Sequence, residues 1–170
     1  MKRQKGFSLI ELLIVVVIIL IIAAIAIPNL LRSKLAANEA SAVSSMRTIT
    51  TAETAYSSSW GTGYAAALTN LGGSVAACAA GAGAANACLI DPVLSTGTKS
   101  GYNFAAVGNT PVGGVNGGFE ANATPVSVGV SGQRAFCADQ TGVIRFNLTG
   151  AAIGTAAGAC AGGGTVLVGN

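Results

Sequence analysis

The sequence contains no histidine and few charged residues. Only 9% of its 170 residues are charged, and six of them are acidic. Acid-base and nucleophilic catalysis need titratable side chains that converge on one place, and a mixed cysteine and histidine metal site needs histidine as well. We therefore expect a protein that is not an enzyme and holds no metal or cofactor. The remaining function classes are structural or binding ones.

A strongly basic surface is also missing. The net charge of +3 comes from Lys2, Arg3 and Lys5, because the chain from Phe7 onward carries six basic and six acidic residues. Nucleic-acid binding draws most of its affinity from lysine and arginine set along the phosphate backbone. The balanced charge after the first six residues thus gives no indication of a specific nucleic-acid partner.

Charge is absent from residues 12–31, and this stretch is strongly apolar. At about 1.5 Å per residue, 20 residues in a helix cross a hydrocarbon core of roughly 30 Å. We expect a single-pass membrane segment that has helical structure because lipid leaves the backbone no other partner. The basic start predicts that residues 1–6 stay cytoplasmic, so that the remainder of the chain faces outward. Pro28 interrupts the far end of the segment, where a kink or a weak point is expected.

An amphipathic pattern continues directly from the apolar segment. Apolar residues recur at steps of three and four, with Glu39, Arg47 and Glu53 between them, as expected for a helix with one buried face. We predict one continuous helix from about residue 7 to about residue 59. The predicted organisation is a leader at 1–6, a hydrophobic transmembrane helix at 7–31, an amphipathic continuation at 32–60 and a globular head at 61–170.

Glycine is nearly absent before residue 61 and abundant after it, with 23 of the 24 glycines in the last 110 residues. Residues 61–87 are expected to form an irregular loop, and the segment from Asp91 to Gly97 a short capped helix that begins with Pro92. Short β-prone runs bounded by turn residues follow, with a tight turn at 139–142. These runs are 102–107, 119–123, 125–130, 133–138 and 143–148. The predicted fold class is α+β, with the long N-terminal helix packed on a small antiparallel sheet of about four strands.

Four cysteines, Cys78, Cys88, Cys137 and Cys160, lack the close spacing of a zinc or redox motif. An even number of cysteines beyond a membrane-targeting segment is typical of disulfides in an oxidising compartment. Three connectivities are possible. Loop closure costs least between near neighbours, which favours Cys78 with Cys88 and Cys137 with Cys160. Free buried thiols are the alternative.

Glu11 is the unusual residue of the apolar region. A conventional secretory signal has a shorter apolar stretch, and cleavage after Ala26 would release a soluble chain that starts at Ile27. The length of the apolar run and the glutamate near its start both disfavour that interpretation. A carboxylate in the first turn of a helix interacts favourably with the helix dipole. One interpretation is therefore that Glu11 is merely tolerated at the membrane interface and has no further role.

The residues KGFSLIELLIV at 5–15, with AAIAIP at 23–28, resemble the N-terminal signature of type IV pilins and the related type II secretion pseudopilins. The resemblance implies that a prepilin peptidase cuts between Gly6 and Phe7 and methylates the new amino group of Phe7. It also implies that Glu11 of one subunit neutralises this amino group on a neighbour in a filament.

The resemblance further implies that the helix near Pro28 loses regular structure on assembly; a static kink is the alternative. The expected function is that of a type IV pilus subunit, which lies in the inner membrane with its head in the periplasm before assembly. The pilus assembly machinery then polymerises it through its N-terminal helix, at residues 7–31, into an extracellular homopolymer for adhesion, motility or DNA uptake. The rival is a major pseudopilin of a type II secretion system. Those proteins usually hold calcium near the C-terminus, whereas residues 150–170 contain no acidic residue to supply such a site.

Overall fold

The computed structural model describes residues 7–166, so the leader with Gly6, and residues 167–170, lie outside the described part of the chain. The chain divides into two compact units, Met1–Lys34 and Leu35–Asn170. The first contains the apolar segment. The second, which we call the head unit, contains the remaining helices and all the strands.

Helix α1 runs from Leu9 to Trp60 and contains Pro28. It is the one helix among the described residues that is long and apolar enough to cross a membrane. Its buried residues begin only at Ala42, and the large apolar residues from Phe7 to Leu31 are all exposed. The predicted change from an apolar to an amphipathic helix is therefore present in α1.

Six strands form one antiparallel sheet in sequential order. Strands β2 and β3 make a long hairpin whose two-residue turn, Gly113 and Gly114, has positive φ at both positions, as a tight hairpin turn requires. The sheet has two short outer strands, β1 and β6, in addition to the four or so that were predicted. The β2–β3 hairpin is also longer than predicted. The strand bounds are Thr98–Lys99 (β1), Tyr102–Val112 (β2), Val115–Pro125 (β3), Ala135–Asp139 (β4), Arg145–Asn147 (β5) and Thr165–Val166 (β6).

The predicted strand at 125–130 is wrong. Strand β3 ends at Pro125, and the chain then forms a compact turn in which Ser131 donates its backbone N–H to the Ser127 carbonyl at 2.9 Å. Alternating valines suggest a strand, but Gly129 donates its N–H to the Gly132 carbonyl across the turn instead. By contrast, the tight turn expected at 139–142 is present, with Gly142 N–H donating to the Asp139 carbonyl.

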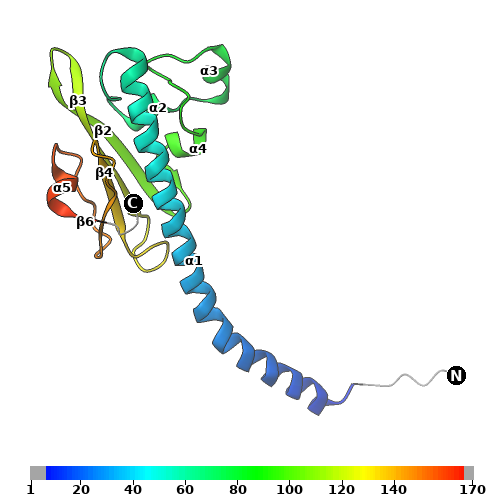
Figure 1. Ribbon diagram of the computed structural model, residues 1–170. Coiled ribbons are helices and arrows are strands. Elements are labelled where there is room, and N and C mark those ends of the chain that lie inside the picture. The colour runs from blue at the N-terminus through cyan, green and yellow to red at the C-terminus, as the bar shows by residue number, and fades with distance from the viewer. Residues whose placement is uncertain (1–6, 167–170) are drawn as a thin grey trace. The chain divides into compact units, whose positions relative to one another are not determined.

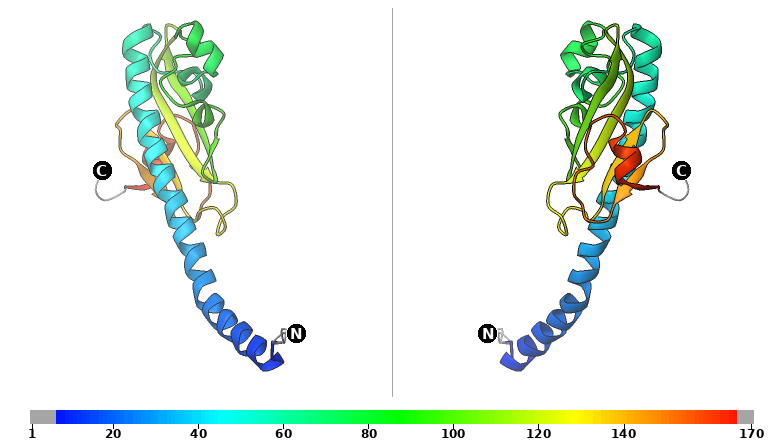
Figure 2. Two further views of the ribbon diagram at one scale, coloured as in Figure 1. Left: turned by 90° about the vertical axis from the view of Figure 1, so that its right-hand side faces the viewer. Right: turned by 90° about the vertical axis from the view of Figure 1, so that its left-hand side faces the viewer.

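The main core lies between the head-unit part of α1 and one face of the sheet (Figures 1 and 2). Because successive side chains of a strand point to opposite faces, every second residue of the central strands joins this core. The α1 contribution includes Met46, Ile49 and Tyr56, all buried. The contributions from the sheet are Tyr102, Phe104 and Ala106 from β2, Phe119, Ala121 and Ala123 from β3, and Phe136 and Ala138 from β4.

The other face of the sheet is covered at β4 and β5 by the C-terminal segment that contains α5, Ala159–Gly163 (Figure 2). Cys137, Ile153 and Cys160 form a second small cluster there. With both faces covered, all five residues of β4 are buried.

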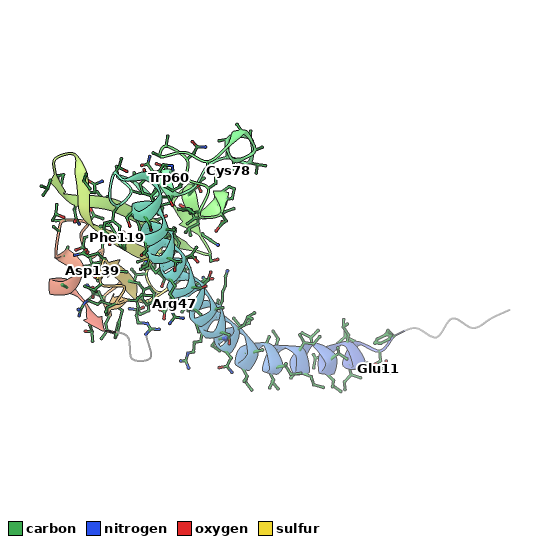
Figure 3. All side chains as sticks on the ribbon, turned by 45° about the horizontal axis from the view of Figure 1, so that its top comes forward. Glu11, Arg47, Trp60, Cys78, Phe119 and Asp139 are labelled. Atoms are coloured by element: carbon green, nitrogen blue, oxygen red, sulfur yellow. A yellow bond between two sulfur atoms is a disulfide. The ribbon has the colours of Figure 1, made fainter. Side chains whose placement is uncertain are left out.

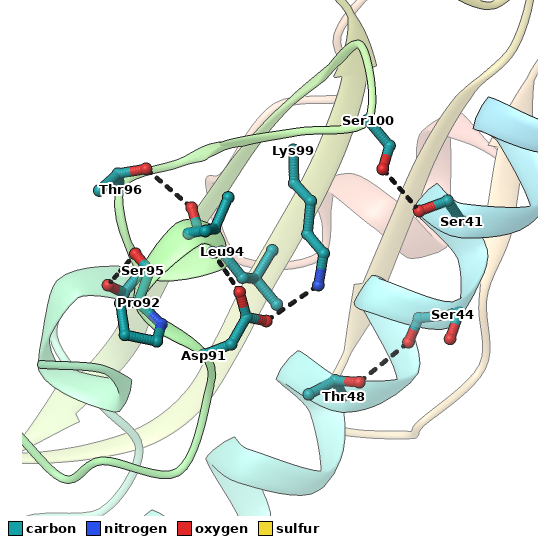
Figure 4. A network of polar contacts seen from close by, with 11 residues as sticks. Ser41, Ser44, Thr48, Asp91, Pro92, Leu94, Ser95, Thr96, Lys99 and Ser100 are labelled. Atoms are coloured by element: carbon teal, nitrogen blue, oxygen red, sulfur yellow. Dashed lines mark hydrogen bonds and ion pairs between the residues drawn. The ribbon is translucent and has the colours of Figure 1, made fainter. Parts of the chain in front are cut away.

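Short helices occupy part of the segment expected to be an irregular loop. They are α2, Leu68–Leu71, and α3, Val75–Ala80. The next helix, α4 (Pro92–Ser95), begins as predicted: the Asp91 carboxylate accepts the Leu94 N–H at 3.0 Å and also binds Lys99 Nζ at 2.9 Å (Figure 4).

Candidate functional site

The predicted processing site lies at the edge of the described residues. Phe7 is the first described residue and its side chain is 81% exposed. Gly6 and the bond between Gly6 and Phe7 fall outside the described part. Cleavage at this bond and methylation of Phe7 therefore stay predictions at this point.

Glu11 has a defined partner within the chain. Its Oε2 atom accepts a hydrogen bond from the backbone N–H of Ser8 at 2.9 Å, and the Ser8 carbonyl accepts the N–H of Glu11 at 3.1 Å (Figure 3 labels Glu11). A serine followed three residues later by glutamate is the pattern in which such a carboxylate satisfies a backbone N–H at a helix start. The sequence interpretation missed this contact, although the Ser8 to Glu11 spacing indicates it.

This contact explains how a glutamate is accommodated at the start of an apolar helix. The first N–H groups of a helix have no acceptor within the helix, and the carboxylate supplies an acceptor for one of them. It also fixes the side chain close to the chain's own N-terminal end, beside the position at which cleavage before Phe7 would create an amine. Glu11 remains exposed, so its carboxylate can be reached by a second molecule.

Pro28 lies within α1 and removes one backbone donor from the ladder of the helix. The carbonyl of Ala24, four residues earlier, consequently receives no N–H from position 28. In the next turn, Ser33 donates its hydroxyl to the Asn29 carbonyl at 2.9 Å, a type of contact that bends or loosens helices. The expected weak point thus has two local causes, but its loss of structure on assembly remains a prediction.

Two disulfides connect all four cysteines: Cys78 with Cys88, and Cys137 with Cys160. This is the connectivity that the short sequence separations favour. The second disulfide is fully buried and fixes the C-terminal segment to β4. The first closes a loop rich in alanine and glycine that includes the end of α3.

An ion pair joins α1 to the start of β4. Arg134 donates through Nε to Glu39 Oε2 at 2.8 Å, and Glu39 Oε1 accepts the backbone N–H groups of Gln133 and Arg134. Burial raises the pKa of Glu39, but these hydrogen bonds and the arginine charge outweigh it and leave the pKa below its ordinary value. The guanidinium also lies over the rings of Phe136 and Phe146, with centroid distances of 5.6 and 5.4 Å.

Glu53 is not on the polar side of the helix, contrary to the sequence interpretation. It follows Ile49 by four residues and is completely buried. Its Oε2 accepts the Ala65 N–H at 2.8 Å, while Oε1 has no hydrogen-bond partner among the described residues. Burial raises the pKa of Glu53 to about 7, against the lowering effect of the Ala65 hydrogen bond.

Glu120 of β3 holds the C-terminal segment on the sheet. Its two carboxylate oxygens accept the backbone N–H groups of Gly158 at 2.7 Å and Cys160 at 3.2 Å. Burial, aided by the charge of Asp139 on the neighbouring strand, raises the pKa of Glu120 against these hydrogen bonds. Asp139 in turn accepts hydrogen bonds from the backbone and hydroxyl of Thr141.

The carboxylates of Glu53 and Glu120 therefore serve to hold backbone segments. Residues 7–166 contain no group of three or more cysteine, histidine, aspartate and glutamate side chains placed to hold a metal ion. The features that remain as a candidate functional site are those of the N-terminal segment, from the leader to Pro28.

Residues 1–27 match the family model of the prokaryotic N-terminal methylation motif. The chain therefore carries a class III signal peptide of the kind found in type IV pilins and pseudopilins. Its long N-terminal helix packed against an antiparallel sheet has the α+β arrangement of the pilin fold. No curated protein and no solved structure was matched.

The motif has consequences for the whole chain. It implies processing by prepilin peptidase and assembly into a polymer, and it indicates a structural protein. Together with the apolar helix, it is consistent with anchoring in a membrane before assembly. The motif thus supports a type IV pilin or pseudopilin precursor.

Proposed function

We propose that the chain is the structural subunit of a type IV pilus. Prepilin peptidase cleaves between Gly6 and Phe7 and methylates the Phe7 amine, and the pilus assembly machinery moves the subunit from the inner membrane into an extracellular homopolymer. The observation that carries the proposal is the methylation motif at residues 1–27, followed by an apolar surface along α1 that is exposed in the single chain. Such a surface needs lipid before assembly and other subunits after it.

In the polymer, Glu11 neutralises the Phe7 amine of a neighbouring subunit. An unpaired charge between packed apolar helices is strongly disfavoured, so this pair fixes the axial register even where it adds little net stability. The hydrogen bond from Ser8 supports this role, because it orients one carboxylate oxygen inward along the chain's own backbone. The other oxygen, Oε1, makes no hydrogen bond within residues 7–166 and is available to the incoming amine.

Pro28 serves as the point at which α1 yields during assembly. The missing N–H and the Ser33 hydroxyl contact in the following turn weaken the helix over a short stretch. Such a stretch lets the apolar segment repack without disturbing the head unit, whose core begins at Ala42.

A major pseudopilin of a type II secretion system is the second candidate. Calcium in such a site takes several oxygen ligands, chiefly carboxylates. Glu120, which contacts the C-terminal segment, accepts two backbone N–H groups of that segment, and Oδ1 of its cross-strand partner Asp139 accepts the Thr141 N–H. We therefore favour the type IV pilus. Whether the pilus serves adhesion, motility or DNA uptake depends on the organism that makes it.

Deletion of the gene, followed by electron microscopy of the cell surface, tests the proposal. The pilus function predicts long surface filaments that disappear on deletion and return with the restored gene. Unchanged filaments, together with loss of protein export through the outer membrane, would instead identify a pseudopilin.

A further inference from the structure

The two disulfides differ in their access to solvent. Cys137 and Cys160 are fully buried, whereas Cys78 and Cys88 are both partly exposed. Cys78 lies on α3 at the edge of the head unit (Figures 1 and 3). Thiol–disulfide exchange begins when a thiolate reaches one of the two sulfur atoms. The bond between Cys78 and Cys88 is therefore the one that a thiol in solution can attack.

The sequence around this bond leaves an incoming thiolate unopposed by charge. Residues 54–90, which contain both cysteines, include no charged residue. The acidic residue nearest to Cys88 in the sequence is Asp91, and it forms an ion pair with Lys99 at 2.9 Å. A thiolate is an anion, so an unpaired carboxylate beside the bond would repel it. The ion pair removes that obstacle.

The backbone at Cys88 has an unfavourable conformation. Its φ of +56° lies in the left-handed region, which residues with a side chain rarely adopt. The Cys88 N–H donates to the Gly72 carbonyl at 3.1 Å, and the bond to Cys78 holds the side chain. Conformations of this kind persist only where the surrounding structure imposes them. Cleavage of the bond lets Cys88 relax, so the strain favours the reduced form of this pair.

Helix α3 belongs to a segment that we call the α3 arm, residues 74–81. None of the six residues of the helix is buried, and an isolated helix of this length is unstable in water. Besides the disulfide at Cys78, the Asn86 amide connects the arm to the chain that follows it. This amide donates to the carbonyls of Ala77 at 3.4 Å and Gly81 at 3.3 Å. Both hydrogen bonds are long, so the disulfide is the stronger of the two connections.

The chain on the other side of the disulfide, residues 84–90, is held on the head unit by hydrogen bonds. The Ala87 N–H donates to the Asn70 carbonyl at 2.8 Å. The Ala84 carbonyl accepts the hydroxyl of Tyr56, a core residue of α1, at 2.7 Å. These contacts do not involve the sulfur atoms and remain when the bond is cleaved. Reduction therefore changes the α3 arm and leaves residues 84–90 in place.

We propose that the bond between Cys78 and Cys88 is a reversible redox site for a protein dithiol of the C-x-x-C class, and that its reduction releases the α3 arm. A thiolate of the dithiol attacks Cys78 Sγ and forms a mixed disulfide, while Cys88 leaves as a thiolate and takes up a proton. The second thiol of the partner then loses its proton and attacks the mixed disulfide, so that Cys78 leaves as a thiolate and is protonated. Two electrons pass to the chain, which ends with two thiols, and the partner ends with a disulfide. This site does not depend on the proposed pilus function.

Hydrogen exchange tests the release of the α3 arm. Reduction of the Cys78 and Cys88 pair in the full-length chain should speed amide exchange in the arm on the order of tenfold and leave β2 unchanged. A chain with both Cys78→Ser and Cys88→Ser should show the same fast exchange without reductant, because it lacks the bond. Unchanged exchange in the arm after complete reduction of this pair would contradict the release.

A trapping experiment tests the protein partner. Thioredoxin, a C-x-x-C protein, with its second active-site cysteine replaced by serine should form a stable mixed disulfide with the full-length chain at Cys78. The matched control is the chain with Cys78→Ser and Cys88→Ser, which keeps the buried disulfide and should give no adduct. Absence of an adduct with the unaltered chain, or an adduct at Cys137 or Cys160, would overturn exchange with a protein dithiol at this site.

Graded reduction tests the site most directly, with the buried disulfide as the control within the same molecule. The full-length chain in detergent is treated with dithiothreitol without denaturant and alkylated with iodoacetamide, and peptide mass spectrometry follows each cysteine. We expect Cys78 and Cys88 to be alkylated together, on the order of tenfold or more faster than Cys137 and Cys160. Equal rates for the two pairs, or faster reduction of the buried pair, would overturn the proposal.

Discussion

The carboxylate of Glu11 caps its own helix by accepting the Ser8 N–H at 2.9 Å. A residue that resembles a fault in a membrane segment thus has a local structural role before any second subunit is present. That role offsets part of the cost of placing a carboxylate near the edge of the bilayer, which is on the order of 3 kcal/mol or less. The proposed pairing with a neighbour's amine adds to this role and can be separated from it experimentally.

Two substitutions at Glu11 make that separation. Glu11→Ala removes both the cap and the charge, whereas Glu11→Gln keeps an oxygen that can accept the Ser8 N–H but carries no charge. If the charge sets the register, we expect both variants to insert normally and both to lose filaments on the order of tenfold, measured as sheared filament protein relative to total subunit. Full recovery by Glu11→Gln would assign the residue to capping alone.

The buried Glu53 predicts a specific pH dependence of stability. Its folded pKa of about 7 exceeds the ordinary value of 4.5, so the unfolded chain loses this proton first as the pH rises. The contribution of Glu53 to the free energy of unfolding should therefore fall between about pH 4.5 and 7 and stay constant above. The difference between these two pKa values corresponds to about 3 kcal/mol of stability.

Glu53→Gln isolates this effect, because the other titrating groups are common to both proteins. We expect the stability of the variant relative to the unaltered chain to rise by up to about 3 kcal/mol from pH 4.5 to 7.5, whatever constant cost the amide adds. Chemical denaturation of the detergent-purified chain at a series of pH values measures the difference. A difference that does not change with pH would contradict the burial of an uncompensated carboxylate at position 53.

The two disulfides should contribute unequally to stability. The bond between Cys137 and Cys160 closes the longer loop, with a separation of 23 residues against 10, and both its sulfur atoms are in a buried cluster. Loop entropy alone gives about 3.5 kcal/mol for this bond and about 2.8 kcal/mol for the other. We expect paired alanine substitutions at 137 and 160 to lower the melting temperature more than those at 78 and 88, measured by circular dichroism. The reverse order would contradict the role of the C-terminal segment in the sheet.

Arg134 should not be replaceable by lysine. Lysine keeps the charge but loses the planar group that binds Glu39 and lies over Phe136 and Phe146. We expect Arg134→Lys to cost about 1 to 2 kcal/mol, and a double-mutant cycle with Glu39→Gln to give a coupling of about 1 kcal/mol for this partly exposed pair. The same cost for Arg134→Lys in the presence and absence of Glu39 would show that only the ring contacts matter.

The sequence predicts the parts of this fold that depend on local chemistry. The continuous helix follows from unbroken periodicity, the start of α4 from Asp91 and Pro92, and the turn before β5 from residues 139–142. Family resemblance at residues 5–28 adds what local chemistry cannot, namely the prediction of a processing site between Gly6 and Phe7. The favoured cysteine pairing follows from loop length.

The predictions from sequence are wrong where tertiary contacts determine the local structure. Val126, Val128 and Val130 alternate as in a strand, but Pro125 ends β3 and serine contacts fold the valines into a turn. The charge of Glu53 indicates the polar face of the helix, yet its spacing from Ile49 places it in the core. In both cases residue type is a weaker guide than position along the element.

The central claim is that this chain is processed at Gly6 and polymerised with its apolar helix intact. Mass spectrometry of purified surface filaments tests it most directly. We predict an N-terminal peptide that begins at Phe7 and carries one methyl group on its amine. A filament subunit that begins at Met1 or Ile27, or the absence of this chain from the filaments, would contradict the claim.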